Sequence, residues 1–165
     1  MFSFNTSHIF GREPWAIRNR QPLRRDVVLD GTNADDLIEG EQGNDSIDAG
    51  EGADSIGGGA GADQIDAGGG NDVVNGGKGA DLISGEKGAD NLDGSSGNDT
   101  LEGGKGKDSL NGGKGDDLLV GGKGADQFEI SGGQDIIKDF NPEEGDKILL
   151  PNQPLLPPMQ MPDFE

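Results

Sequence analysis

Carboxylate side chains recur in this sequence at a fixed spacing of nine residues. An aspartate stands at every ninth position, a glycine precedes each one by two positions, and an apolar residue follows each one by two. Carboxylates carry a full negative charge and offer only acceptor oxygens, so an array of them is suited to binding cations. The unbroken series is Asp45, Asp54, Asp63, Asp72, Asp81, Asp90, Asp99, Asp108, Asp117 and Asp126.

Each nine-residue unit has two parts. Its first six residues are turn formers, rich in glycine, that tolerate positive φ. Its last three alternate polar, apolar and polar, which is the period of a strand with one buried side chain. A single three-residue strand is not stable alone, so the units are expected to stack in parallel and bury the apolar residues in a column. Two units then make one coil of 18 residues, and the array makes about five to six coils.

Upstream of Gly40 the nine-residue period is expected to be interrupted by one extra residue. The interpretation is an eleventh unit from Asp30 to Ile38 with Asp35 as its metal-site aspartate. In this reading Asn33 takes the place of the glycine, and Glu39 is one extra residue.

The composition limits what else the chain can be. It has 165 residues, 32 glycines, 30% hydrophobic residues, no cysteine and a formal net charge of -19. Such a chain buries too little apolar surface to offset the entropy of ordering glycine, so either it is disordered or a cationic partner stabilises it. A disordered linker is the plain alternative, and a basic protein is another partner, but the strict phase of the repeat favours metal ions. Nucleic acid is disfavoured because its phosphates would be repelled.

The repeat also resembles a known family. Residues 76–84, Gly-Gly-Lys-Gly-Ala-Asp-Leu-Ile-Ser, match the pattern Gly-Gly-x-Gly-x-Asp-x-apolar-x of the repeats-in-toxin (RTX) haemolysin-type calcium-binding repeats. The resemblance covers about 100 residues and implies an all-β fold, a right-handed parallel β-roll (β-helix solenoid). The right hand also follows from the handedness of parallel crossovers.

The resemblance implies calcium as the cofactor, and Ca²⁺ takes six to eight oxygen ligands. An ion between adjacent coils is expected to take the aspartates of units n and n+2 and carbonyls of the glycine turns. One ladder uses Asp35, Asp54, Asp72, Asp90, Asp108 and Asp126, and the other uses Asp45, Asp63, Asp81, Asp99 and Asp117. Their gaps allow at most about nine ions. The glycines assigned to the sites are Gly43, Gly52, Gly61, Gly70, Gly79, Gly88, Gly97, Gly106, Gly115 and Gly124. Without calcium the stacked carboxylates would repel one another, and the chain is expected to be largely disordered.

Four segments are expected along the chain. Residues 1–29 form a basic N-terminal arm or cap that holds every arginine, residues 30–130 form the β-roll, residues 131–150 cap it, and the proline-rich residues 151–165 form a disordered tail. The arm could instead dock on an acidic partner or membrane surface, and the capping segment could be a partner-binding strand. His8, the single histidine, is interpreted as a surface residue.

No catalytic signature accompanies the repeat, so the chain is predicted not to be an enzyme. Lys78, Lys114 and Lys123 follow paired glycines but are themselves followed by glycine rather than Ser or Thr, which excludes a phosphate-binding loop. No transmembrane segment and no cleaved N-terminal signal are expected, and the chain is predicted to be extracellular, exported by type I secretion. The predicted function is calcium binding by a monomer that folds on its ions. The alternative is a module that uses the rigid roll or the basic arm to bind a cell surface or a polysaccharide.

Overall fold

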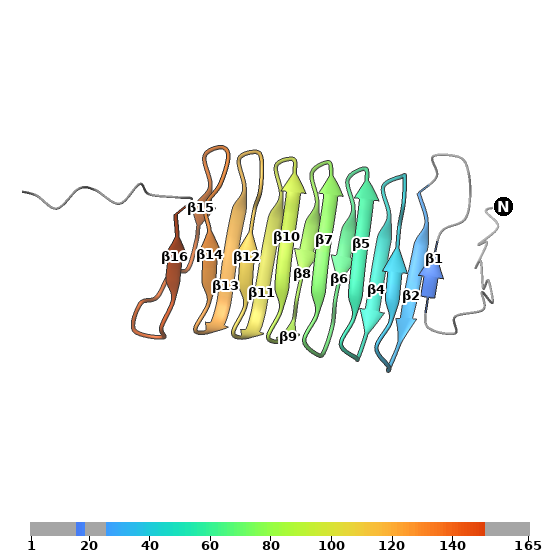
Figure 1. Ribbon diagram of the computed structural model, residues 1–165, viewed down its shortest axis with the longest axis horizontal. Helices are drawn as coiled ribbons and strands as arrows, with labels where there is room; N and C mark the ends of the chain where they lie inside the picture. The colour runs from blue at the N-terminus through green and yellow to red at the C-terminus, as the bar shows by residue number, and fades with distance from the viewer. Residues whose placement is uncertain (1–15, 19–25, 151–165) are drawn as a thin grey trace, which may run out of the picture.

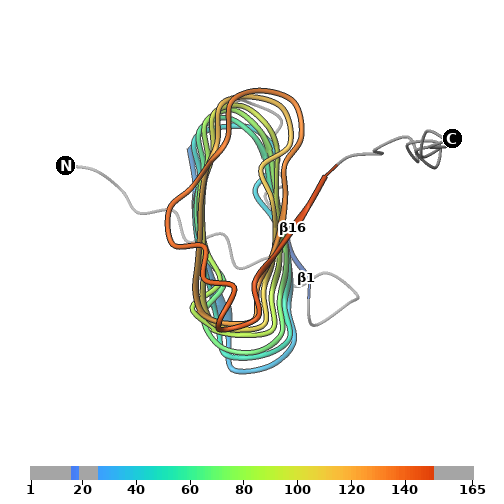
Figure 2. The same cartoon turned by 90° about the vertical axis from the view of Figure 1, so that its left-hand side faces the viewer.

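The protein forms a parallel β-solenoid, in which two sheets face each other and are joined by turns at both edges. This computed structural model describes residues 16–18 and 26–150. Figure 1 shows the strands side by side along the long axis, and Figure 2 shows the coils superimposed as a flattened ring. The all-β parallel roll expected from the repeat is confirmed. Residues 1–15, 19–25 and 151–165 lie outside the described residues. The predictions for His8, for most of the N-terminal arm and for the proline-rich tail fall on them.

The first sheet contains strands from alternate units, each hydrogen-bonded to the strand one coil away. Its order is β1 (Ala16–Arg18), β3 (Leu37–Glu39), β5 (Ser55–Ala60), β7 (Val73–Lys78), β10 (Asn91–Ser96), β12 (Ser109–Asn111), β14 (Gln127–Glu129) and β16 (Lys147–Leu149). Every described pairing within it is parallel.

The second sheet contains the intervening strands. Its order is β2 (Val28–Thr32), β4 (Ser46–Gly50), β6 (Gln64–Asp66), β8 (Leu82–Ser84), β11 (Thr100–Gly106), β13 (Leu118–Gly124) and β15 (Ile136–Ile137), and β9 (Lys87–Gly88) also pairs with β11. The register repeats every 18 residues, as in the partners Ile47↔Ile65 and Ile65↔Ile83.

The solenoid has about seven turns, more than the five to six coils expected. The additional strands come from the flanks: β1 and β2 precede the regular units, and β15 and β16 follow them. These segments lack the complete nonapeptide pattern, but an alternating apolar stretch is enough to add a strand to an open sheet edge.

The core is the column of apolar residues that the repeat predicts. In the twelve strands β2–β8 and β10–β14, one residue points inward and is at most 8% exposed: Leu29, Ile38, Ile47, Ile56, Ile65, Val74, Ile83, Leu92, Leu101, Leu110, Leu119 and Phe128. At the C-terminal end Phe140 meets Phe128 edge to face, with ring centroids 6.3 Å apart. The described residues include no helix that is long and apolar enough to cross a membrane.

Candidate metal centre

The turns hold the repeated aspartates in two buried rows, one along each edge of the solenoid. We call them the Asp54 row and the Asp63 row. The Asp54 row contains Asp36, Asp54, Asp72, Asp90, Asp108 and Asp126, and the Asp63 row contains Asp45, Asp63, Asp81, Asp99 and Asp117. Apart from Asp36, at 7%, these side chains are only 1–3% exposed.

One carboxylate oxygen of each aspartate connects two layers. Oδ1 of Asp63 accepts the backbone N–H of Asp45 at 2.8 Å, and Oδ1 of Asp81 accepts that of Asp63 at 2.8 Å. The Asp54 row repeats this bond, from the N–H of Asp72 to Oδ1 of Asp90 at 2.9 Å. Each aspartate therefore braces the turn that lies 18 residues earlier.

The other carboxylate oxygen has no protein partner. Oδ2 is buried and without a hydrogen bond in ten aspartates: Asp45, Asp54, Asp63, Asp72, Asp81, Asp90, Asp99, Asp108, Asp117 and Asp126. An ionised carboxylate that is buried and half satisfied is strongly destabilising unless a cation compensates it. These orphaned oxygens fit a row of bound metal ions.

Further oxygens face the same place. A Cβ added to Gly58 would lie 2.7 Å from Oδ2 of Asp63 and 2.6 Å from the carbonyl oxygen of Gly76, one layer away. The same pair of oxygens surrounds Gly94, at 2.5 Å from Asp99 Oδ2 and 2.7 Å from Gly112 O. Hard oxygen ligands, a carboxylate and carbonyls, are the donor set that Ca²⁺ prefers.

The chain has alanine at two equivalent positions of the Asp54 row. Ala49 and Ala67 stand where Gly85 and Gly103 stand in later coils, and both are fully buried. Their methyl groups narrow the space beside Asp54 and Asp72. The space beside the buried carboxylates is therefore not identical along the row.

The expected site residue of the first unit is corrected. Asp36, not Asp35, occupies the row, because the N–H of Asp36 donates to Oδ1 of Asp54 at 2.7 Å. Asp35 is exposed and its Oδ1 accepts the N–H of Ala53 at 2.8 Å. The nine-residue period thus continues back to Asp36 without interruption, and Glu39 is not an extra residue but the partner of Gly57 in the sheet. Asn33 does not take the place of the glycine, which Ala34 occupies in this register.

Three aspartates are satisfied by their own turns: Asp36, which begins the Asp54 row, and Asp135 and Asp146, which follow the last members of the two rows. Oδ2 of Asp36 accepts the N–H of Thr32 at 2.7 Å and its hydroxyl at 2.8 Å. Oδ2 of Asp135 accepts the N–H of Ser131, and Oδ2 of Asp146 accepts that of Asn141 at 2.8 Å. In these three turns Oδ2 accepts hydrogen bonds from the protein, whereas Oδ2 has no partner in the ten turns between them.

A second set of braces was not predicted. Asn44 Oδ1 accepts the N–H of Ala62 at 2.8 Å, and Asn71 Oδ1 accepts that of Ala89 at 2.8 Å. These residues directly precede the buried aspartates, and their bonds run in the opposite direction along the axis. The recurrence of Asn or Asp at this place in the nonapeptide was the available signal.

The ten glycines expected in the metal sites all lie in the turns, with φ between 129° and 150°. Packing requires glycine there. A Cβ on Gly61 would lie 1.6 Å from the carbonyl oxygen of Gly43, so no side chain fits between the layers. At another turn position Glu41, Glu86 and Ser95 tolerate φ of 65° to 75°.

Burial raises the pKa of the ten row aspartates from Asp45 to Asp126. The pKa of Asp90 rises to about 7, mainly through desolvation and further through the negative charges of Asp108 and Asp72. The pKa values of Asp45, Asp99 and Asp108 rise to about 6 for the same first cause. In the metal-free roll these carboxyl groups lose their protons less readily than exposed ones. A bound cation would lower their pKa again by stabilising the ionised form.

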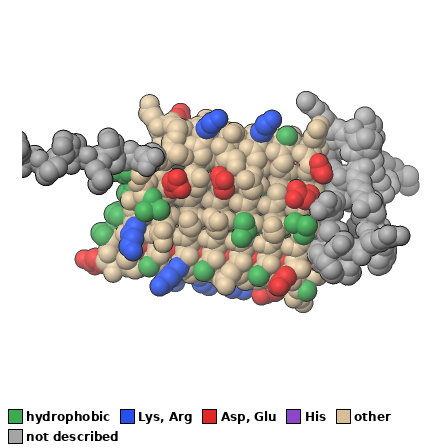
Figure 3. All heavy atoms as spheres, viewed as in Figure 1, with side chains coloured by type: hydrophobic (Ala, Val, Ile, Leu, Met, Phe, Trp, Pro, Cys, Tyr) green, Lys and Arg blue, Asp and Glu red, His purple; other side chains and the backbone are tan. Residues whose placement is uncertain are grey.

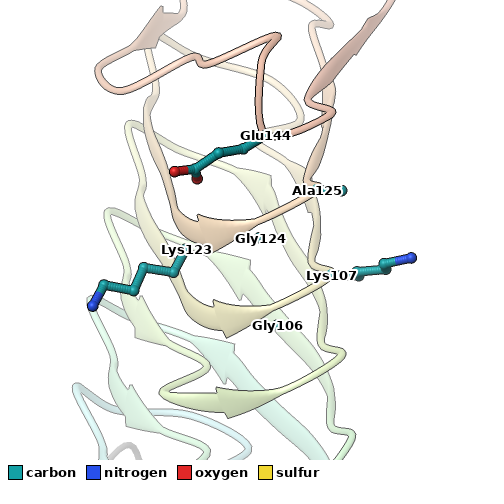
Figure 4. A pocket seen from close by; sticks show the side chains of 6 residues that line it. All are labelled: Gly106, Lys107, Lys123, Gly124, Ala125 and Glu144. Atoms are coloured by element: carbon teal, nitrogen blue, oxygen red, sulfur yellow. The ribbon is translucent and has the colours of Figure 1, made fainter.

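No compact side-chain cluster accounts for metal binding. Across residues 16–18 and 26–150, no group of three or more His, Cys, Asp or Glu side chains is placed to hold one ion. Backbone carbonyls must therefore complete any site in these rows. A separate hollow of about 460 Å³ lies at the C-terminal end of the Asp54 row, lined by Gly106, Lys107, Lys123, Gly124, Ala125 and Glu144 (Figure 4).

The stacked turns, the ladder of carboxylates and the apolar column define a class of protein: a β-roll whose repeats carry metal sites. Comparison with protein families matches four copies of the RTX calcium-binding nonapeptide repeat, at residues 30–65, 66–101, 93–128 and 102–137. The matched stretch exceeds half of the chain, and the chain belongs to this family. The nonapeptide repeats of this family bind calcium. A search of curated proteins returned no match to the chain.

Proposed function

We propose that this chain is a non-enzymatic protein that folds on binding several Ca²⁺ ions between the layers of its roll. The ten buried Oδ2 atoms without a hydrogen-bond partner are the observation that carries the proposal. They form five consecutive positions in each row, and carbonyl oxygens of the neighbouring turns face them.

The aspartates with a free Oδ2 limit the number of ions. Five such aspartates in a row enclose four gaps, so the two rows provide about eight sites. This is one fewer than the nine expected from the sequence, because that number included a gap between Asp35 and Asp54. The terminal turns, closed by Asp36, Asp135 and Asp146, lie outside the sites.

Calcium then supplies the free energy that the small core lacks. Stacked carboxylates about 5 Å apart repel one another when ionised, and ions between them remove that repulsion. Metal binding and folding are one event for such a chain. Extracellular calcium would fold the protein, and the low calcium concentration of the cytosol would keep it unfolded for export by a type I route.

The alternative function, adhesion or polysaccharide binding, has little support from the described surface. Among residues 16–18 and 26–150 the only aromatic side chains are Phe128 and Phe140, which contact each other. Phe128 is fully buried and Phe140 is 40% exposed, so the described surface offers a sugar ring a single exposed aromatic side chain rather than a platform of several.

Circular dichroism during calcium titration tests the proposed function. The expected result is a cooperative gain of β-structure with Ca²⁺ and little gain with Mg²⁺, which prefers octahedral sites and retains its water. Calorimetry should then give about eight ions per chain. A chain that is fully folded in chelator and unresponsive to calcium would contradict the proposal.

A further inference from the structure

Charged side chains are segregated along the turn edge that carries the Asp54 row. We call this edge, with the strand ends beside it, the charged rim. Its first three layers expose only acids, and its next three expose lysines together with Glu86 and Glu102. The acids of the first half and the lysines of the second are Asp30 with Asp35, Asp48 with Glu51, Asp66, Lys87, Lys105 with Lys107, and Lys123. Along the lower edge in Figure 3, basic side chains lie over the C-terminal half and acidic ones towards the N-terminal end, with further acidic atoms at the C-terminal extreme.

The strand register stacks like charges on consecutive layers. Asp30 pairs with Asp48, and Asp48 with Asp66, in the second sheet. Lys87 pairs with Lys105, and Lys105 with Lys123, at the turns. Both series therefore share one repeat, the spacing of parallel strands, which is about 4.8 Å.

Within one molecule the two halves of the rim hardly neutralise each other. Lys87 Nζ reaches Glu51 at 3.9 Å across the glycine of the intervening layer, and this is the single ion pair among the residues that the structure describes. Asp48 and Asp66 lie side by side in the strand register without a basic partner among the described residues. Desolvation, and then the charges of Glu86 and Asp48, raise the pKa of Asp66. Lys105 and Lys123 have no acidic partner in the described part of the chain.

The pattern is complementary to itself when reversed. If a second copy lies antiparallel against the rim, with the two-fold axis between β6 and β8, each lysine layer faces an acidic layer. Lys123 then faces the layer of Asp30, Lys105 the layer of Asp48, and Lys87 the layer of Asp66. A contact of this kind is isologous and closes as a dimer, the commonest symmetry of soluble oligomers.

We propose that two copies of the calcium-loaded chain associate through the charged rim as an antiparallel two-fold dimer, in place of the monomer expected by default. The proposal rests on the proposed function, since bound Ca²⁺ must first reduce the net charge of -19 that separates two chains. Two acids in the lysine half, Glu86 and Glu102, weaken the match. Exposed ion pairs contribute little each, so the dimer is of modest affinity and sensitive to salt.

Charge reversal and exchange test the dimer. Sedimentation of the full chain in saturating calcium and low salt should show a dimer that dissociates in high salt. The triple variant Lys87→Glu, Lys105→Glu, Lys123→Glu should raise the dissociation constant by at least about tenfold, and so should Asp30→Lys, Asp48→Lys, Asp66→Lys. An equimolar mixture of the two variants should associate again, because each then offers the charge that the other needs.

A matched control changes the net charge equally away from the rim. The variant Lys78→Glu, Lys114→Glu, Lys147→Glu should dimerise like the unaltered chain. A monomer at all salt concentrations, an equal effect of the control, or no association in the mixture would overturn the proposal. Calcium-induced circular dichroism of each variant separates this outcome from a failure of the proposed function, in which the unaltered chain would show no response to calcium.

Discussion

The backbone N–H of Asp63 donates to Oδ1 of Asp81 at 2.8 Å, while Oδ2 of the same Asp81 is buried without a partner. One oxygen thus joins two layers of protein and the other faces the space between them. The aspartate is at once a brace of the fold and a ligand position. Loss of its charge should therefore affect metal binding more than it affects the layer contact.

Asp81→Asn should remove about two calcium ions, those shared with Asp63 and Asp99, and leave the Asp54 row loaded. The amide oxygen can still accept the N–H of Asp63, so folding at high calcium should persist. Calorimetric stoichiometry measures the loss. The control is Asp116→Asn, an exposed acid whose Oδ1 accepts the N–H of Gln134 at 2.9 Å. An unchanged number of ions in Asp81→Asn would argue against sites shared along the row.

Replacement of the terminal aspartates should leave the number of ions unchanged. In Asp36→Asn and Asp146→Asn the amide can keep an acceptor for the N–H groups of Thr32 and Asn141, and no ion is lost because none is held there. We expect the same stoichiometry as in the unaltered chain, with a loss of stability of about 1 kcal/mol. Calorimetry with a parallel thermal melt checks both values. If either variant binds fewer ions, the calcium row extends to the ends.

Gly61→Ala should unfold the roll even in saturating calcium. The added Cβ would lie 1.6 Å from Gly43 O, and φ at this position is 143°. Overpacking and backbone strain together should cost at least about 3 kcal/mol. Urea denaturation in calcium measures the change. Gly57→Ala is the control, because its Cβ would meet only the flexible end of the Glu39 side chain, at 2.8 Å. Equal stability of the two variants would contradict the interpretation.

The repeat alone predicts the roll and the two rows, because period and residue type are visible in every regular unit. At the ends the pattern breaks, and the sequence misled at one residue. Either Asp35 or Asp36 could be the row aspartate, because either Leu37 or Ile38 could be the apolar residue two positions later. The sheet register, which pairs Ile38 with Ile56, selects Asp36. A strict nine-residue step back from Asp45 would have found it.

The flanks were harder to predict for a different reason. Asp135 and Asp146 continue the rows at 18 and 20 residues from their neighbours, but Ile130-Ser131 and Asn141-Pro142 stand where regular units begin with paired glycines. Their hydrogen bonds to Ser131 and Asn141 depend on turns that no repeat specifies. The same holds for Asp139, whose two oxygens accept the N–H groups of Gly121 and Gly122. The hydrogen bonds of Asp139 join residues that are far apart in the sequence, so local propensity does not predict them.

Acid should stabilise the metal-free roll and weaken calcium binding. Burial lifts the folded-state pKa of Asp90 to about 7 and that of Asp99 to about 6, above the ordinary carboxyl value of 3.8 that applies to an unfolded chain. Between these values the folded state binds more protons than the unfolded state. Its stability without metal therefore rises as pH falls from about 7 to about 4, and it is lost as pH rises through the folded pKa.

Circular dichroism in chelator at a series of pH values measures this gain, and calorimetry at the same pH values measures the calcium affinity. The β-signal of the metal-free chain should grow as the buffer is acidified, and the affinity should fall through the same interval because protons and Ca²⁺ compete for the carboxylates. Asp90→Asn removes the carboxyl whose pKa burial raises to about 7. It should shift the upper end of the transition to lower pH, whereas Asp116→Asn, at an exposed position, should not. A metal-free chain that is equally unfolded at pH 5 and pH 7.5 would show that the buried rows form only around the ions.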